Sequence, residues 1–173
     1  ELIFRKLLID RLAQYGEGVA VLFSGLMFGL FHGNLNQFVY AFVLGLCFGF
    51  IYVKTGNIRY TIGLHMLVNF LGSVLGVAIL KWLGDDFLSI ASDPAGMMSY
   101  MTGNFGKLIV YFIYIFLLLG VAIAGIILFI VNLKKIRFQP GMNTIPKGKR
   151  LSTTVLNVGM ALYMIVWIVI IIV

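Results

Sequence analysis

The chain has 173 residues, of which 61% are hydrophobic and only 11% are charged, and its mean hydropathy is +1.06. These values exclude a soluble globular domain. The 13 Lys and Arg outnumber the 6 Asp and Glu and give a formal charge of +7, but most of this excess lies between apolar segments. We therefore expect membrane lipid as a partner and no nucleic acid.

Long apolar segments with few charges and only 3 Pro favour membrane helices over the short alternating strands of a barrel. The prediction is an all-α fold, a polytopic membrane helix bundle with about five complete or partial spans after an N-terminal helix end. We expect a single membrane domain over residues 1–173, with a protease-like core that carries the motifs at residues 1–80 and peripheral spans and loops at residues 81–173. The lone Cys47 lies in an apolar segment, so no disulfide framework is predicted.

The elements expected along the chain begin with an amphipathic helix end at residues 1–14. Apolar segments follow at residues 19–32, 35–53, 60–80, 108–131 and 154–173. The segment at residues 81–107 is rich in Asp, Gly and Ser, and we expect it to be a loop outside the membrane. The segment at residues 19–32 is short for a span, since about 20 residues are needed to cross the bilayer.

The loop between the last two spans fixes the expected orientation. It holds six basic residues and no acidic one: Lys134, Lys135, Arg137, Lys147, Lys149 and Arg150. By the positive-inside rule this loop is cytoplasmic, and alternation along the chain then places the acidic loop at residues 81–107 outside. We expect an integral protein of the bacterial plasma membrane.

Polar residues within or beside the apolar segments occur in pairs four positions apart. Glu1 precedes Arg5, and His65 precedes Asn69; His32 stands at the same distance from Phe28. On a helix this spacing places both members on one face. Polar side chains in lipid are costly and are functional candidates by default.

These residue types suit a hydrolase that activates water, because a carboxylate or imidazole can take a proton while an imidazole or amide stabilises an oxyanion. Simpler interpretations remain open: the histidines as packing or turn-end residues, and Glu1 with Arg5 as an ordinary helix ion pair. The cofactor is either none or a divalent metal such as zinc, with His32 and His65 as its ligands. A metal-free site is favoured.

Three segments together resemble a known family. Glu-Leu-Ile-Phe-Arg at residues 1–5, Phe-Gly-Leu-Phe-His at 28–32 and His-Met-Leu-Val-Asn at 65–69 are similar to the ordered motifs EExxxR, FxxxH and HxxxN. These motifs belong to the CAAX protease and bacteriocin-processing (CPBP, or Abi) family, which includes the Ras-converting enzyme type of CAAX prenyl endopeptidase. The resemblance covers residue 1 to about residue 80.

The resemblance implies an intramembrane endopeptidase that hydrolyses a peptide bond in a peptide or protein substrate. It implies that His32 helps to bind or polarise the water, that His65 and Asn69 stabilise the oxyanion, and that Glu1 and Arg5 orient the site. The family motif has two adjacent glutamates, and the spacing to Arg5 makes Glu1 the second of them. The first, the principal base, would precede this chain, so we expect the fragment alone to be inactive.

A non-catalytic role is the alternative hypothesis. A membrane protein that acts in bacteriocin immunity, or that binds a peptide between the same helices, would carry the same resemblance. A transporter is a weaker third possibility, because no span is visibly broken around an ion site.

Overall fold

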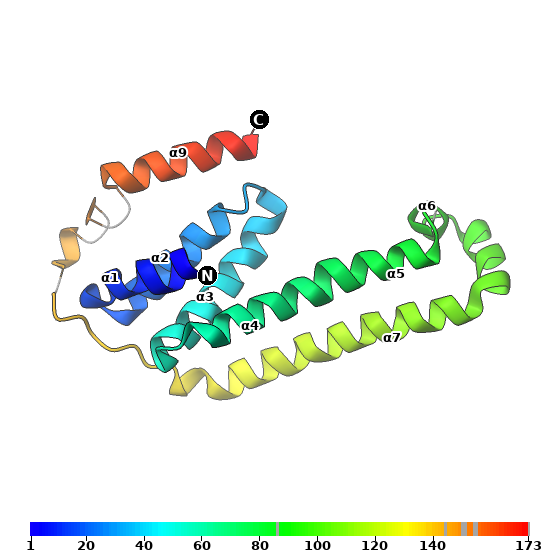
Figure 1. The fold of residues 1–173 in the computed structure, drawn as a ribbon, viewed down its shortest axis with the longest axis horizontal. Coiled ribbons are helices and arrows are strands. Elements are labelled where there is room, and N and C mark those ends of the chain that lie inside the picture. The colour runs from blue at the N-terminus through cyan, green and yellow to red at the C-terminus, as the bar shows by residue number, and fades with distance from the viewer. Residues whose placement is uncertain (86, 144, 150–151, 154–155, 173) are drawn as a thin grey trace. The chain divides into compact units, whose positions relative to one another are not determined.

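The computed structural model describes residues 1–85, 87–143, 145–149, 152–153 and 156–172. Every named element in these ranges is helical, which confirms the predicted all-α fold (Figure 1). The chain divides into two compact units. The first unit comprises Glu1–His65 with Phe138–Val173, and the second comprises Met66–Arg137.

The first unit begins with a π-helix and contains the helices that carry the motifs. Its elements are η1 (Leu2–Ile9), α1 (Asp10–Leu12), η2 (Ala13–Tyr15), α2 (Glu17–Leu30), α3 (Leu35–Thr55), the part of α4 (Ile58–Asn69) up to His65, η5 (Lys147–Lys149) and α9 (Val158–Ile172). Helices α2 and α3 form an antiparallel pair, because the connection between them is only a few residues long. Asn34 starts α3 by accepting a hydrogen bond at 2.8 Å from the backbone of Asn36.

Helices α2 and α3 approach closely at two glycines. A Cβ added to Gly45 would come within 2.8 Å of the Gly25 Cα, and a Cβ added to Gly25 would come within 3.1 Å of the Leu46 backbone nitrogen. No side chain larger than hydrogen fits at this crossing without displacing backbone. Gly25 and Gly45 therefore allow α2 and α3 to pack closely.

The N-terminal helix packs against this pair. Phe4 forms a buried cluster with Phe28 and Ala41, and the Tyr52 hydroxyl donates a hydrogen bond to Asp10 at 2.8 Å. These contacts hold the start of the chain against α2 and α3.

The end of the chain returns to the first unit. Glu17 at the start of α2 accepts a hydrogen bond from the Gln139 amide at 2.9 Å and forms an ion pair with Lys54. Further along, the Tyr163 hydroxyl of α9 donates to the Met27 carbonyl at 2.8 Å, and the ring of Trp167 lies 5.0 Å from that of Phe31. Helix α9 therefore packs on α2 close to the turn that carries His32.

The second unit is built from helices that pack along one another. It contains the end of α4, η3 (Phe70–Leu75, a π-helix), α5 (Gly76–Leu83), α6 (Phe87–Ala91), α7 (Pro94–Asn132) and η4 (Leu133–Lys135). Its buried cluster is formed by Ile79, Leu83, Phe87 and Leu108. The Tyr114 hydroxyl of α7 donates to the carbonyl of Leu71 in η3 at 2.8 Å, and this bond fixes the register between α7 and η3.

The expected loop at residues 81–107 is largely helical, and the prediction of a loop there was wrong. Helix α7 already begins at Pro94, because Asp93 accepts hydrogen bonds from the amides of Ala95 and Gly96 and Pro94 occupies the first turn. Asp93 and Pro94 together form a helix start. The non-helical backbone of Asn104 marks a kink inside α7.

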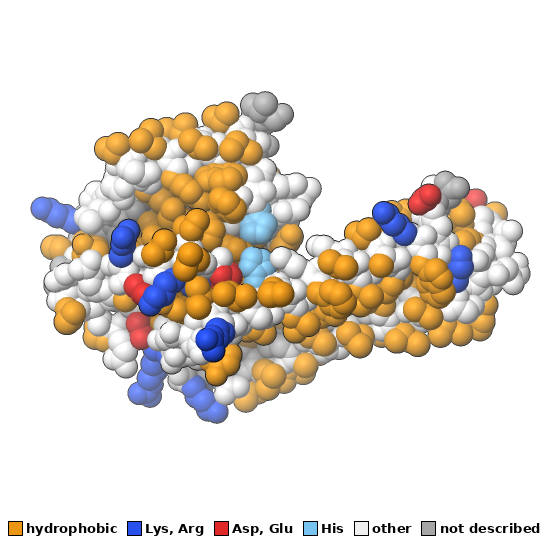
Figure 2. Space-filling view, in the orientation of Figure 1, with side chains coloured by type: hydrophobic (Ala, Val, Ile, Leu, Met, Phe, Trp, Pro, Cys, Tyr) orange, Lys and Arg blue, Asp and Glu red, His pale blue; other side chains and the backbone are white. Residues whose placement is uncertain are grey.

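Within the described part of the chain, three helical segments are long and apolar enough to cross a membrane: Leu35–Thr55, Ile58–Leu83 and Pro94–Lys135. Shorter apolar helices lie at Glu17–Leu30 and Val158–Ile170. Large hydrophobic side chains on these helices are exposed, and Figure 2 shows them covering much of the visible surface. Such surfaces require lipid rather than water, so the protein is an integral membrane protein.

Candidate functional site

Glu1 and Arg5 form an ion pair at the start of the first unit. The Nε of Arg5 donates to the Oε2 of Glu1 at 3.2 Å, with the Arg5 side chain fully buried and that of Glu1 7% exposed. The two residues are one helical turn apart, as their spacing predicts. Because the guanidinium is buried, this pair differs from a solvated ion pair on a helix surface.

The Arg5 guanidinium lies between two aromatic rings and a hydroxyl. Its Cζ is 4.7 Å from the centroid of the Phe28 ring and 5.7 Å from that of Phe48. The Nη1 donates to the Oγ of Ser24 at 2.5 Å. Cation–π contacts and charge-assisted hydrogen bonds thus replace the water that a buried guanidinium loses.

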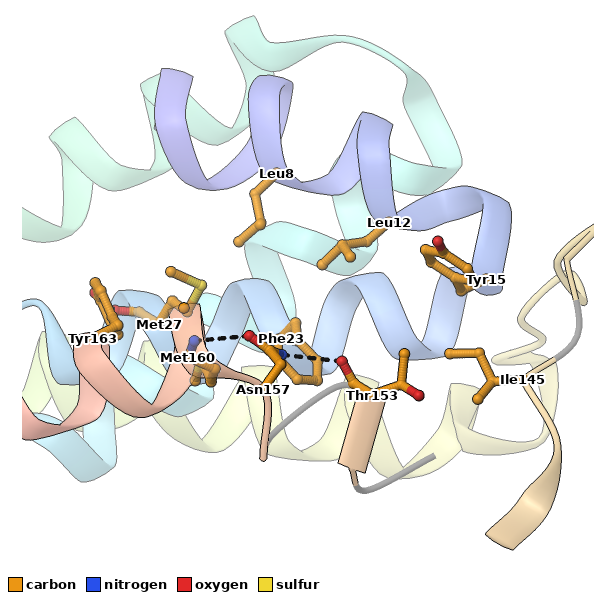
Figure 3. A pocket seen from close by; sticks show the side chains of 11 residues that line it. Leu8, Leu12, Tyr15, Phe23, Met27, Ile145, Thr153, Asn157, Met160 and Tyr163 are labelled. Atoms are coloured by element: carbon orange, nitrogen blue, oxygen red, sulfur yellow. Dashed lines mark hydrogen bonds between the residues drawn. The ribbon is translucent and has the colours of Figure 1, made fainter. Parts of the chain in front are cut away.

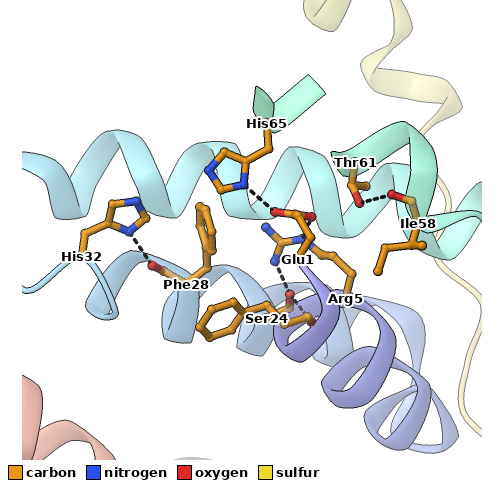
Figure 4. A network of polar contacts seen from close by, with 9 residues as sticks. Glu1, Arg5, Ser24, Phe28, His32, Ile58, Thr61 and His65 are labelled. Carbon is orange, nitrogen blue, oxygen red and sulfur yellow. Dashed lines mark hydrogen bonds and ion pairs between the residues drawn. The ribbon is translucent and has the colours of Figure 1, made fainter. Parts of the chain in front are cut away.

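His65 meets the same carboxylate from α4. Its Nδ1 lies 3.0 Å from the Oε1 of Glu1, and its ring lies 5.3 Å from the Phe28 ring and 5.8 Å from the Phe48 ring. Glu1 therefore divides its two oxygens between Arg5 and His65 (Figure 4). An ionised carboxylate only accepts hydrogen bonds, so Nδ1 carries a proton and Nε2 is the ring nitrogen left for water or substrate.

His32 stands at the end of α2, on the other side of the Phe28 ring. Its Nδ1 is 2.8 Å from the Phe28 carbonyl oxygen, to which it donates, and its ring lies 4.9 Å from the Phe28 ring. Figure 4 shows the Phe28 ring between the two imidazoles. In each histidine Nδ1 is bonded within the protein, so His32 and His65 both keep Nε2 for other partners.

Asn69 is not part of this network. It is the last residue of α4, it is exposed, and it belongs to the second unit. Of the five site residues predicted from the sequence, the structure brings Glu1, Arg5 and His65 together and places His32 across the ring of Phe28. The four-residue spacing of His65 and Asn69 on α4 stands, and the joint role of this pair stays a prediction.

A metal at this site would rest on few ligands. Among the residues that the structure describes, no three His, Cys, Asp or Glu side chains gather as a metal-binding group. Glu1 and His65 are bonded to each other. The fit of a zinc ion to these residues is therefore incomplete, since zinc sites use at least three protein ligands.

Ser24 and Phe48 are contact residues of this site that the motif analysis missed. Ser24 is fully buried in α2, one turn before Phe28 and on the same helix face. The available signal was a hydroxyl in an apolar helix at that spacing. Phe48 carried no such signal, because one more aromatic residue in an apolar span looks like packing.

Two cavities lie elsewhere in the first unit. One of about 280 Å³ is drawn in Figure 3 and is lined largely by apolar residues of the N-terminal helix, α2 and α9, among them Leu8, Leu12, Phe23, Met160 and Tyr163. A second of about 510 Å³ lies between the start of α2 and a later segment that includes residues 138–141, Asn143 and Ile145. None of the five predicted site residues lines either cavity.

The family comparison concerns the N-terminal part of the chain. Residues 1–71 match the family of Rce1-like type II CAAX prenyl endopeptidases. This confirms the resemblance seen in the three motifs. No curated protein and no solved structure matched the chain.

The match to the Rce1-like family spans the whole constellation. Glu1, Arg5, His32, His65 and Asn69 all lie within residues 1–71. Helices α7 and α9 lie outside the matched residues. The family similarity thus coincides with the helices that carry the polar network.

Proposed function

We propose that the protein is an intramembrane endopeptidase that hydrolyses a peptide bond through water activated by glutamate and histidine. The observation that supports this most strongly is the contact of Glu1 with both Arg5 and His65, within a segment that matches a family of CAAX prenyl endopeptidases. The contact joins two of the three motifs. A buried carboxylate held between a guanidinium and an imidazole is a typical way to orient a catalytic histidine.

The proposed reaction is the addition of water to a peptide carbonyl followed by loss of the amine. His32 binds the attacking water through Nε2, and a glutamate takes its proton. The proton then passes to the leaving nitrogen, so that one water is consumed for each bond broken.

Glu1 and Arg5 orient the site in this scheme. In this scheme His65 acts as the imidazolium, with a proton on each ring nitrogen: Nδ1–H donates to Glu1, and Nε2–H donates to the oxyanion that forms on the peptide carbonyl. Asn69 supplies a second donor to the same oxygen. The proposal uses no metal, and a cleavage rate unchanged by chelators is the expected result of metal removal.

The test is cleavage of a peptide substrate by the full-length protein in membranes or detergent. His32→Ala and His65→Ala should each abolish cleavage without lowering the amount of folded protein. Thr61→Val is the matched control, since Thr61 is buried one turn before His65 on α4 and its hydroxyl donates to the Ile58 carbonyl at 3.0 Å. Turnover at the wild-type rate in either histidine variant would remove that residue from the mechanism, and absence of cleavage by the wild-type full-length protein would favour the non-catalytic role in bacteriocin immunity or peptide binding.

A further inference from the structure

The hydroxyl of Ser24 belongs to the polar network but to none of the three motifs. We propose that Ser24 is a positioning residue, which acts through Arg5 to fix the Glu1 carboxylate in the orientation that meets His65. This inference rests on the proposed endopeptidase function and adds a residue to its machinery.

The environment of Ser24 requires that its hydroxyl be bonded. The residue lies in the middle of the apolar helix α2 and is fully buried, and a buried hydroxyl without partners destabilises a protein. Its Oγ donates to the Phe4 carbonyl at 2.8 Å and accepts from the Nη1 of Arg5 at 2.5 Å. The single proton is used on Phe4, so the oxygen offers only lone pairs to the guanidinium.

The guanidinium of Arg5 is planar, and two bonded nitrogens define its orientation. Nε is bonded to Glu1 and Nη1 to Ser24, while Nη2 is buried without a partner among the described residues. If Ser24 lost its hydroxyl, Glu1 would be the one remaining polar side chain bonded to Arg5 in the described network. The guanidinium and the carboxylate could then turn together within the ring contacts of Phe28.

The orientation of Glu1 matters because its two oxygens have different partners. Oε2 is bonded to Arg5 and Oε1 to His65. A rotation of the carboxylate that follows Arg5 would lengthen the contact to His65. Ser24 touches neither His65 nor the Nε2 proposed to face the substrate, so its effect on catalysis passes through Arg5 and Glu1.

A purely structural role makes a different prediction. The bond from Ser24 to Phe4 also joins η1 to α2, and its loss would lower the amount of folded protein. It would leave the turnover number of the folded fraction unchanged. The two roles are therefore separated by kcat per folded molecule and by the state of His65.

The kinetic test compares Ser24→Ala, Ser24→Cys and Ser24→Thr in the full-length protein. We expect kcat to fall about 10- to 100-fold in the first two, with KM nearly unchanged, because misplaced groups lose catalysis rather than binding. Thr keeps the hydroxyl and should restore most of the rate. In an Arg5→Lys background Ser24→Ala should add little further loss, because both changes act on one contact.

A second measurement does not depend on activity. The chain has 2 His, so the imidazole ¹⁵N signals of His32 and His65 can be assigned by single substitutions. Ser24→Ala should change the ¹⁵N shifts of His65 and leave those of His32 unchanged, and Thr61→Val should change neither. If Ser24→Ala had the wild-type kcat and the wild-type ¹⁵N shifts of His65, the positioning role of Ser24 would be wrong. If the protein proved not to be an endopeptidase, the ¹⁵N shifts of His65 alone would test whether Ser24 positions Glu1.

Discussion

Glu1 and His65 are 64 positions apart in the chain, and their side chains meet with the Oε1 of the carboxylate 3.0 Å from the Nδ1 of the imidazole. The contact joins the π-helix at the N-terminus to α4. It also separates the two carboxylate oxygens, since the other is held by Arg5 at 3.2 Å.

Replacement of Glu1 by Gln tests the charge of the carboxylate with its shape preserved. In wild type the two carboxylate oxygens accept hydrogen bonds from Arg5 and from His65. The Gln amide has one oxygen that can accept one of these bonds, and its NH2 group places a donor against the other residue. We expect kcat to fall by about 10²-fold or more through misorientation of the imidazole. Asp85→Asn, at an exposed acidic residue of the second unit, is the control and should keep the wild-type rate.

Asn69 tests the proposed oxyanion contact. Loss of one such donor costs on the order of 10²–10³ in turnover, or about 3–4 kcal/mol of transition-state stabilisation. Asn69→Ala should therefore lower kcat far more than it raises KM. The control is Asn132→Ala, because Asn132 is a partly buried helical amide that donates to the Leu128 carbonyl at 2.8 Å.

Asn69→Asp keeps the shape of the side chain but replaces the amide donor by a carboxylate, which repels an oxyanion. Near-normal kcat in Asn69→Asp would contradict the oxyanion role. A metal-ligand role for His65 would then be the better interpretation, and inhibition by a chelator would be the next measurement.

The glycine crossing between α2 and α3 gives a stability prediction. Gly45→Ala adds a methyl group 2.8 Å from the Gly25 Cα, where only a backbone shift makes room. Overpacking of this kind costs about 1–3 kcal/mol, so the thermal midpoint in detergent should fall. Gly63→Ala on α4 is the matched control: its Cβ would meet nothing within 4 Å, and the substitution should be neutral or stabilising by about 0.5–1 kcal/mol.

The orientation in the membrane is tested at Ser92, an exposed residue between α6 and α7. After replacement of Cys47, a cysteine introduced by Ser92→Cys should react with a membrane-impermeant thiol reagent in whole cells. The basic loop at residues 134–150 lies on the opposite side of the bilayer in this prediction. Labelling seen only after cell lysis would reverse the orientation.

Contacts within one helix of the candidate site are easier to predict from the sequence than contacts between helices. Spacing alone indicates that Glu1 and Arg5 share a face, because that relation is local to one helix. The contact of Glu1 with His65 depends on where α4 lies against η1. His65 follows Arg59 on α4 by only six residues, but this separation in sequence does not show how deep in the membrane the His65 imidazole lies.

Ser24 and the start of α7 show two further limits of sequence reasoning. A hydroxyl in an apolar helix is read as incidental until its partners are known, and both partners of Ser24 come from a different helix. Asp93 and Pro94 are residue types found both in loops and at helix starts. The hydrogen bonds that the Asp93 carboxylate accepts from the backbone amides of Ala95 and Gly96 show that they start a helix here. In both cases the deciding contact involves backbone groups, which the sequence does not distinguish.

The return of the C-terminal segment to the first unit has a consequence for biogenesis. Glu17 is bonded to Gln139 and Met27 to Tyr163, across 122 and 136 positions of the chain. These bonds can form only after the ribosome has synthesised the whole second unit. During translation the helices that carry the candidate site are therefore in the membrane before α9 has been made. In a nascent chain halted near residue 137, the Met27 carbonyl and the Phe31 ring lack their contacts with α9 and are accessible to lipid and chaperones.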